Sequence, residues 1–293
     1  MTKDRQNKQK LGGILTARTE GGLRPRGRII AAGVAEHPLV TIITVVRNGA
    51  SVIEQTILSV LEQSYKNIEY IIIDGGSTDG TLDIIKRFDD QIAYWLSEPD
   101  KGIYDAMNKG IDLSTGDWIN FMNAGDRFYQ TDTVQRVISS DCGTADLVYG
   151  HCQMVYAPDF SLIWKAMNIT DLWKGMIFRH QSLFTKASVC KKLYFSLDYK
   201  IGADFAFIFS CYKNKYKFSN IDLVVSSVSA GGLSDTSIIL AWKETRRAVV
   251  QYHNTLKVNI YYRWMIFFAY LKIAVKKILP SKIRNRARSL KYR

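Results

Sequence analysis

Three aspartates of this chain stand where predicted strands end or helices begin, and carboxylates in such places can bind cations or accept protons. Asp74 and Asp126 each follow an apolar run that predicts a strand, and Asp204 is a lone acid in an apolar stretch. Mg²⁺ and Mn²⁺ take oxygen ligands, often one or two carboxylates plus phosphate oxygens, which makes Asp126 a candidate metal ligand. The apolar surroundings of Asp204 make it a candidate general base, because desolvation raises the pKa of a carboxylate.

Each aspartate also has an ordinary structural alternative. Asp74 could cap the turn that follows it, Asp126 could be a simple turn residue, and Asp204 could cap a helix. The chemical interpretation makes one geometric prediction that separates it from these alternatives. We expect the three acids, which are far apart in sequence, to meet around a single cleft.

Further polar side chains are candidates for binding a substrate. His180 is the only histidine followed by a polar cluster, although a lone histidine is more often structural. Four polar residues flank the apolar stripe of a helix predicted from residue 103 onward: Tyr104, Asp105, Asn108 and Lys109. A solvated helix face explains these four equally well.

The elements that must position these residues form a strand–helix–strand unit. The β-branched run 39–46 and the apolar run 68–73 each predict a strand that is buried on both faces. Between them, apolar residues recur at four-residue spacing from Ile53 to Leu61, which predicts a helix with one buried stripe. Such a unit implies adjacent parallel strands joined by a right-handed crossover.

The carboxyl ends of these two strands should therefore share one rim. The first strand ends at Arg47-Asn48 and the second at Asp74, and ligands of open α/β sheets bind outside such ends. Further strands are predicted at 92–96, 116–122 and 144–149, whereas residues 150–200 show no clear pattern. Together, these predicted strands and helices indicate an α/β fold with a mostly parallel central sheet flanked by helices.

The composition is that of a globular chain with positive charge near its ends. The 293 residues are 47% hydrophobic and 23% charged, and the formal net charge is +13. Residues 1–36 contain eight Lys or Arg and three acids, and the last 22 residues contain nine Lys or Arg and no acid. Basic ends fit a membrane surface or solubility better than a groove that reads bases, so nucleic acid is not expected as a partner.

The compartment is predicted from cysteines and apolar runs. None of the four cysteines is part of a Cys-x-x-Cys pair, which is typical of reduced thiols in a cytosolic protein. The N-terminus lacks the apolar core of a secretory signal. No apolar run reaches the ~18 residues of a membrane span, so we expect a cytoplasmic protein.

The C-terminal region is predicted to be helical and basic. Residues 236–256 have a helical pattern, and Trp264–Leu271 is an aromatic and apolar run with Arg263 before it and Lys272 after it. This combination fits a helix that lies in a membrane interface, here the cytoplasmic face of an inner membrane. Packing on the core or on another subunit is the alternative.

Several motifs in a fixed order resemble those of the family 2 glycosyltransferases, which have the nucleotide-sugar-binding GT-A (Rossmann-like) fold. The matching segments are 41–48, 57–64, 69–81, 97–110, 116–119 and 123–126. Several motifs in order match by chance far less often than any one of them. The resemblance implies a GT-A domain over residues 38–235. Residues 1–37, which are polar and non-periodic, are expected to form a basic flexible arm before it, and residues 236–293 a C-terminal region after it.

The resemblance also implies roles for residues at the donor site. Thr44, Arg47 and Asn48 would line the nucleotide pocket. Asp74 would bind the base, usually uracil, and Asp79 would support that turn. Further substrate contacts are implied for Asp105, Asn108 and Lys109.

For the reaction itself, the resemblance implies a metal ligand and a base. Asp126 would occupy the metal-ligand place of the family's Asp-x-Asp element, although this chain keeps only one acid there. Asp204 matches the general base of inverting members, and His180-Gln181 would lie near the diphosphate or the acceptor.

The implied activity is the transfer of a sugar from a nucleotide-diphosphate sugar, with UDP as the expected nucleotide, to a glycan or lipid-linked sugar. The transfer would invert the anomeric carbon, would use Mg²⁺ or Mn²⁺, and would serve surface polysaccharide biosynthesis. The reduced acidic element favours an alternative, a catalytically weak protein that binds a nucleotide sugar and scaffolds a glycan assembly complex. A simple dehydrogenase is not expected, because no Gly-x-Gly-x-x-Gly follows the first strand.

Overall fold

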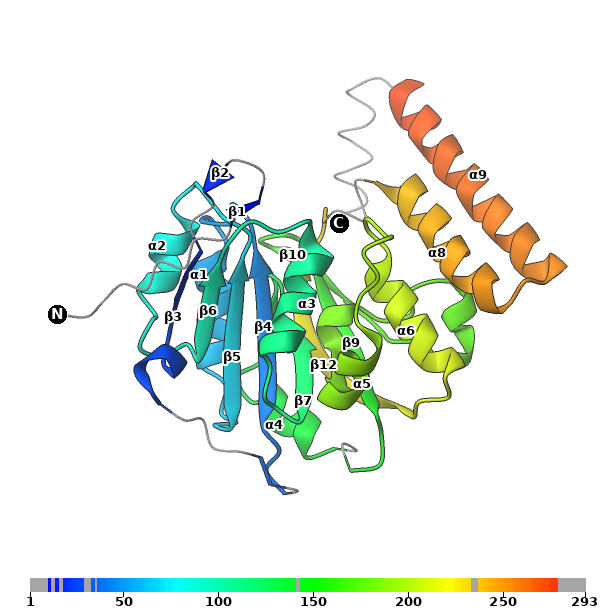
Figure 1. Ribbon diagram of the computed structural model, residues 1–293. Helices are drawn as coiled ribbons and strands as arrows, with labels where there is room; N and C mark the ends of the chain where they lie inside the picture. The colour runs from blue at the N-terminus through cyan, green and yellow to red at the C-terminus, as the bar shows by residue number, and fades with distance from the viewer. Residues whose placement is uncertain are drawn as a thin grey trace.

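A ten-stranded sheet with strand β4 (Val40–Val46) near its centre organises the computed structural model (Figure 1). The structure describes residues 10–11, 14–15, 18–28, 33–34, 36–140, 143–232 and 237–278. The strand order is β3-β6-β5-β4-β7-β11-β9-β12-β8, with β10 added on β9. The other strands of this sheet are β3 (Thr19–Gly21), β5 (Ile68–Asp74), β6 (Tyr94–Ser97), β7 (Trp118–Phe121), β8 (Arg127–Phe128), β9 (Leu147–Ala157), β10 (Phe160–Trp164), β11 (Leu183–Lys186) and β12 (Phe218–Ser229). A separate two-stranded sheet pairs β1 (Lys10–Leu11) with β2 (Ile14–Leu15).

The α/β fold class is confirmed, and the sheet is mixed. Strands β6, β5, β4 and β7 are parallel, as are β9 and β12. Strands β3, β8, β10 and β11 pair antiparallel to their neighbours. In the parallel part, Val46 is paired with Asp74, so β4 and β5 end at the same rim, as predicted.

Helices cover both faces of the sheet, because successive residues of the buried strands point to opposite sides. Ile42 and Ile72 pack in one hydrophobic cluster with α1 (Ile53–Leu61), α2 (Thr81–Lys86) and α4 (Thr133–Ile138). Ile43 and Ile71 pack in another cluster with helices of the opposite face: α3 (Ile103–Leu113), α5 (Ala187–Leu193) and α6 (Ala203–Lys213). Three short 3₁₀ helices are η1 (Arg24–Arg26), η2 (Ile169–Lys174) and η3 (His180–Ser182).

Two further helices form a hairpin at the edge of the molecule (Figure 1). Helix α8 (Ile238–Tyr252) packs on α6, and α9 (Leu256–Ile278) packs on α8. The predicted helical C-terminal region is thus present over its described part, while the boundary expected at residue 235 lies outside the described residues. In the part of the chain that the structure describes, no helix has the length and apolarity for a membrane crossing.

The prediction of a flexible arm over residues 1–37 is wrong for residues 18–28. Strand β3 pairs with β6, and the Arg24 guanidinium forms an ion pair with Glu69. The Glu69 side chain has no exposed surface and also accepts hydrogen bonds from Thr41 Oγ1 (2.6 Å) and the N–H of Thr115 (2.7 Å). A buried carboxylate needs such partners, so this N-terminal segment completes the sheet edge.

Candidate active site

The turns that follow β4 and β5 are joined by hydrogen bonds. The backbone N–H of Asn48 donates to Ser77 Oγ (2.7 Å), and Asn48 Oδ1 accepts from the N–H of Thr78 (2.9 Å). Asn48 has φ of 53°, a left-handed conformation that Asn adopts more readily than most residues. The side chain of Asn48 therefore shapes the rim as well as facing solvent.

Asp79 fixes the same pair of turns from the other side. Its carboxylate accepts from the N–H groups of Ala50 (3.0 Å) and Thr81 (3.1 Å). Hydrogen bonds from the Thr81 side chain and the Ala50 backbone lower the pKa of Asp79. These hydrogen bonds tie Asp79 to the turn after β4 and to the start of α2, and its role at a donor site stays a prediction.

Two residues expected to contact the nucleotide are buried instead. Thr44 has no exposed surface, and its hydroxyl is bonded to Met122 O (2.7 Å) and Tyr70 OH (3.0 Å). Asp74 is 1% exposed, and its carboxylate accepts from Ser77 and from Ser97 Oγ (2.6 Å). This burial does not agree with the prediction that Thr44 lines the nucleotide pocket and that Asp74 binds the base: in the structure both side chains hold the strand ends together.

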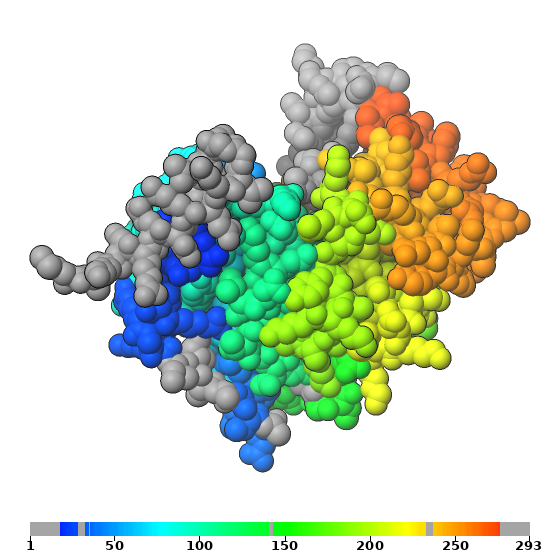
Figure 2. Space-filling model, in the orientation of Figure 1, coloured from blue at the N-terminus to red at the C-terminus, as the bar shows by residue number. Residues whose placement is uncertain are grey.

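Beside Arg47, which is exposed, the half-buried carboxylate of Asp100 approaches this rim. A Cβ atom added at Gly75 would lie 2.1 Å from Asp100 Oδ2 and 3.4 Å from Arg47 Cβ. Gly75 therefore allows Asp100 to approach the turn after β5, opposite Arg47. Figure 2 shows the N-terminal half of the chain and the C-terminal helices on opposite sides of the molecule.

The three predicted contacts on α3 are used within the protein. Lys109 Nζ forms an ion pair with Glu98 (2.8 Å) and lies 3.6 Å from Asp105 Oδ2, and Asp105 also accepts from the N–H of Lys101. The side-chain amide of Asn108 donates from Nδ2 to Phe195 O (2.8 Å) and accepts at Oδ1 from the N–H of Phe195 (2.9 Å). The predicted substrate contact of Asn108 is therefore not seen: its side chain joins α3 to the loop after α5.

His180 brings together the segments that contain Asp126 and Asp204. His180 Nδ1 lies 3.1 Å from Asp204 Oδ2, and His180 Nε2 lies 3.1 Å from Asn123 Nδ2. Because the Asn123 amide nitrogen can only donate, Nε2 accepts, and the Nδ1–H group donates to Asp204. The loop after β7, helix η3 and the first turn of α6 meet at this imidazole.

The carboxylate of Asp204 is held by several groups and is not a lone acid. Its Oδ1 accepts from the N–H of Phe205 (2.8 Å) and lies 3.4 Å from the hydroxyl of Tyr104. Its side chain is 15% exposed. Asp204 lies in the first turn of α6, where backbone N–H groups at the helix start are free to donate to a negatively charged partner.

Asp126 is more deeply buried and lies on the other side of the same cluster. It is 8% exposed, and its Oδ2 accepts from Gln181 Nε2 (2.6 Å). Burial raises the pKa of Asp126, and the Gln181 hydrogen bond and the nearby His180 and Arg179 oppose that rise. The backbone at this point is fixed by Thr56 Oγ1, which donates to Asp126 O (2.8 Å).

The donor set around Asp126 suits a divalent cation that takes few ligands from the protein. No group of three or more His, Cys, Asp or Glu side chains able to hold a metal occurs among the described residues. The amide oxygens Asn123 Oδ1 and Gln181 Oε1 are buried without a hydrogen-bond partner. One carboxylate, with such amide oxygens and the oxygens of a bound diphosphate, is a set that Mg²⁺ or Mn²⁺ accepts.

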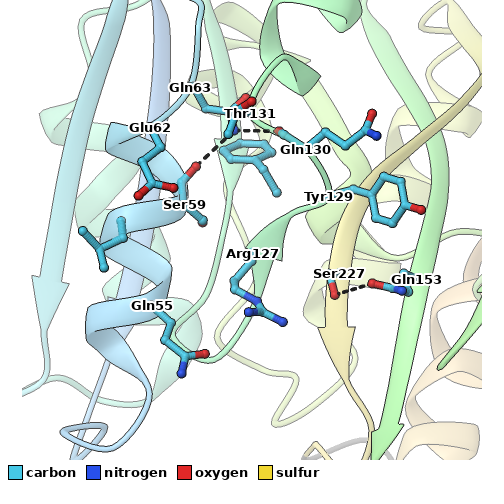
Figure 3. A pocket seen from close by; sticks show the side chains of 12 residues that line it. Gln55, Ser59, Glu62, Gln63, Arg127, Tyr129, Gln130, Thr131, Gln153 and Ser227 are labelled. Atoms are coloured by element: carbon cyan, nitrogen blue, oxygen red, sulfur yellow. Dashed lines mark hydrogen bonds between the residues drawn. The ribbon is translucent and has the colours of Figure 1, made fainter. Parts of the chain in front are cut away.

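The described surface has two pockets, and neither is lined by Asp126, His180 or Asp204. One of about 430 Å³ lies between α1 and the strands β8, β9 and β12. In Figure 3 Arg127 extends into it, with Gln55 on one side and the hydrogen-bonded pair Gln153 and Ser227 on the other. The second, of about 730 Å³, is lined by α5, α6, α8 and the loop between α5 and α6, with Tyr199 from the loop and Arg247 from α8.

Sequence reasoning missed Glu244, which fixes the loop that leads to Asp204. Glu244 lies on α8 and is 7% exposed. Its carboxylate accepts from the N–H groups of Lys200 (2.9 Å), Ile201 (2.9 Å) and Gly202 (2.8 Å), which directly precede α6. The only signal in the sequence was an isolated acid that begins a long segment without acids, and no spacing rule connects it with residue 204.

We expect Glu244→Gln to lower kcat by about 10- to 100-fold while leaving nucleotide affinity unchanged. The amide can accept through one oxygen only, so a buried N–H of the loop loses its partner, and small displacements of a catalytic group are costly. Steady-state kinetics and nucleotide titration measure the two quantities. Glu54→Gln, at an exposed ion pair with Arg87, is the matched control, and an equal loss of kcat and nucleotide affinity would indicate general unfolding instead.

Comparison with known proteins shows which sequences and structures this chain resembles. The family model described as "Glycosyl transferase family 2" matches residues 41–207, which is more than half of the chain. A PGL/p-HBAD biosynthesis glycosyltransferase of Mycobacterium tuberculosis is 32% identical over 220 residues, covering 69% of this chain and 81% of the relative.

Two solved structures have a similar fold. The mannosyltransferase PcManGT from Pyrobaculum calidifontis, in complex with GDP-Man and Mn²⁺, has a TM-score of 0.61 and 18% identity and covers 92% of this chain and 85% of its own. Residues 1–349 of S. aureus TarS, in complex with UDP-GlcNAc, have a TM-score of 0.58 and 15% identity over 72% of this chain. The match covers 66% of that TarS chain, slightly less than two thirds. At these identities the likeness concerns the fold.

Proposed function

The chain belongs to glycosyltransferase family 2, and from this membership we propose that it moves a sugar from a nucleotide-diphosphate sugar to an acceptor hydroxyl with inversion. UDP is the nucleotide we propose, and the acceptor is a glycan or a lipid-linked sugar of a surface polysaccharide, reached at the cytoplasmic face of the membrane. The observation that carries the proposal is the imidazole of His180, which joins Asp204 to the loop of Asp126. Structural neighbours captured with UDP-GlcNAc and GDP-Man support a nucleotide-sugar donor.

Asp204 is the proposed base. The acceptor oxygen attacks the anomeric carbon, its proton passes to the Asp204 carboxylate, and the bond to the leaving phosphate oxygen breaks with its electron pair. His180 donates to Asp204 Oδ2 and so sets the orientation of the carboxylate. One displacement of this kind inverts the anomeric carbon and needs one base.

Asp126 is the proposed ligand of a divalent cation that enters with the donor. When bound, Mg²⁺ or Mn²⁺ would stabilise the charge that develops on the diphosphate. Gln181 orients the Asp126 carboxylate through its hydrogen bond. Arg47, exposed on the rim, is placed to meet the phosphates or the base of the donor.

A panel of nucleotide sugars tests the proposal through release of the nucleotide diphosphate, with Mn²⁺ and with chelator. We expect one UDP-sugar to give acceptor-dependent release that requires the cation, and NMR of the product to show the opposite anomeric configuration to the donor. Retention of configuration would contradict the single-base mechanism. Binding of a donor without any release would favour the scaffolding alternative, to which the single acid at Asp126 points.

A further inference from the structure

Helix α9 has one face in the protein and an opposite face that is apolar and exposed. Val258, Tyr262 and Ala269 are buried against the protein, and Tyr262 OH donates to Trp173 O (2.8 Å). Eight of the eighteen exposed large hydrophobic side chains among the described residues are on α9, at 44% to 78% exposure: Leu256, Ile260, Trp264, Phe267, Phe268, Tyr270, Leu271 and Val275.

These side chains form one continuous stripe. Leu256, Ile260 and Trp264 are four residues apart, and Phe267/Phe268, Leu271 and Val275 continue the spacing, so they share one side of the helix. A helix of 23 residues is about 34 Å long. Figure 1 shows α9 at the outer edge of the molecule, beyond α8 and on the side away from β3. An apolar surface of this extent normally marks an interaction site.

The charge of the last segment of the sequence is entirely positive. Residues 245–293 contain thirteen Lys or Arg and no Asp or Glu, while residues 1–244 contain 27 of each sign. The whole formal net charge of +13 therefore belongs to this last segment. Lys257, Arg263 and Lys272 are exposed on α9 beside the stripe.

We propose that this face of α9 docks on an anionic phospholipid surface, with its aromatic residues in the interface and its cations at the headgroups. Trp, Phe and Leu on one side of a helix with Lys and Arg beside them is the pattern of an interfacial helix. Anionic lipids complement the positive charge, whereas a second copy would bring two such segments together and repel.

The same hairpin is joined to the reaction site. Helix α8, on which α9 packs, holds the loop before Asp204 through Glu244. Docking through α9 would therefore fix the orientation of the active site relative to the membrane. The docking proposal does not rest on the proposed reaction, since lipid binding is measured without donor or acceptor.

Flotation of the full-length protein with vesicles tests the proposal. We expect it to float with vesicles that contain phosphatidylglycerol, to remain unbound with phosphatidylcholine alone, and to be released by salt, which screens such attraction. The variant with Trp264, Phe267 and Phe268 all changed to Gln should lose at least about tenfold in partition. The variant with Arg263 and Lys272 both changed to Gln should lose about fivefold for each charge.

Control substitutions and the oligomeric state complete the test. Leu162→Gln and Ile163→Gln remove exposed apolar side chains on β10 and should leave flotation unchanged. Circular dichroism checks that each variant is folded, and turnover of a soluble acceptor should remain at the wild-type level. Absence of flotation with anionic vesicles overturns the proposal. A dimer in sedimentation that the triple variant dissociates also overturns it, because a second copy would then cover the stripe.

Discussion

Asp204→Asn is expected to lower kcat by about 10²- to 10⁴-fold and to leave the affinity for UDP unchanged, the range typical for loss of a general base. The asparagine oxygen can still accept from His180 Nδ1, which lies 3.1 Å from Asp204 Oδ2 in the wild type, so the cluster should keep its shape. The amide cannot accept the proton of the acceptor. Single-turnover rates and a nucleotide titration separate the two effects.

A matched control distinguishes this role from a general effect of charge. Asp198→Asn changes an exposed carboxylate in the loop that leads to α6, and we expect wild-type turnover from it. His180→Asn removes the group that orients Asp204. If the two residues act as a unit, the double variant should be scarcely slower than Asp204→Asn alone. Normal turnover of Asp204→Asn would refute the assignment of the base.

The arrangement of the rim was predictable because it follows from local patterns and one topological rule. Two apolar runs joined by a helix of four-residue spacing give parallel neighbours, and the register pairs Val46 with Asp74 as that rule requires. Which side chains of this rim are exposed was not predictable in the same way. In a strand buried on both faces, no polar–apolar alternation distinguishes a buried polar side chain such as Thr44 from an exposed one.

The parts that sequence analysis missed depend on contacts between distant segments. Residues 150–200 contain β10 and β11. These strands form by pairing with β7 and β9, and their own residue patterns do not predict them. Strand β3 is a polar tripeptide that becomes a strand because β6 offers an unpaired edge. The family resemblance implied only that His180-Gln181 lies near the diphosphate or the acceptor, and no spacing in the sequence implies the contact of His180 with Asp204.

Asp126→Asn is expected to change stability and activity in opposite directions. Burial raises the pKa of Asp126 above its ordinary value of 3.8, so without a cation the folded state favours the neutral carboxyl. The stability that this group contributes is fully present below the unfolded-state pKa and is lost as pH rises through the raised folded-state pKa. Asparagine stays neutral at every pH, so at neutral pH and without cation the variant should have a Tm equal to or above that of the wild type.

With the cation present, the wild type should have the higher Tm, and this comparison tests whether Asp126 is the metal ligand. Mn²⁺ should raise the Tm of the wild type at neutral pH, because a ligand that binds only the folded state stabilises it, and should not raise that of the variant. Turnover of the variant should fall by about 10²-fold or more, since the charge on the diphosphate loses its counter-ion. Asp132→Asn, an exposed acid at the start of α4, should respond to Mn²⁺ as the wild type does. An undiminished Mn²⁺ shift in Asp126→Asn would place the cation on other residues, and the single carboxylate would then be a structural group whose burial Gln181 compensates.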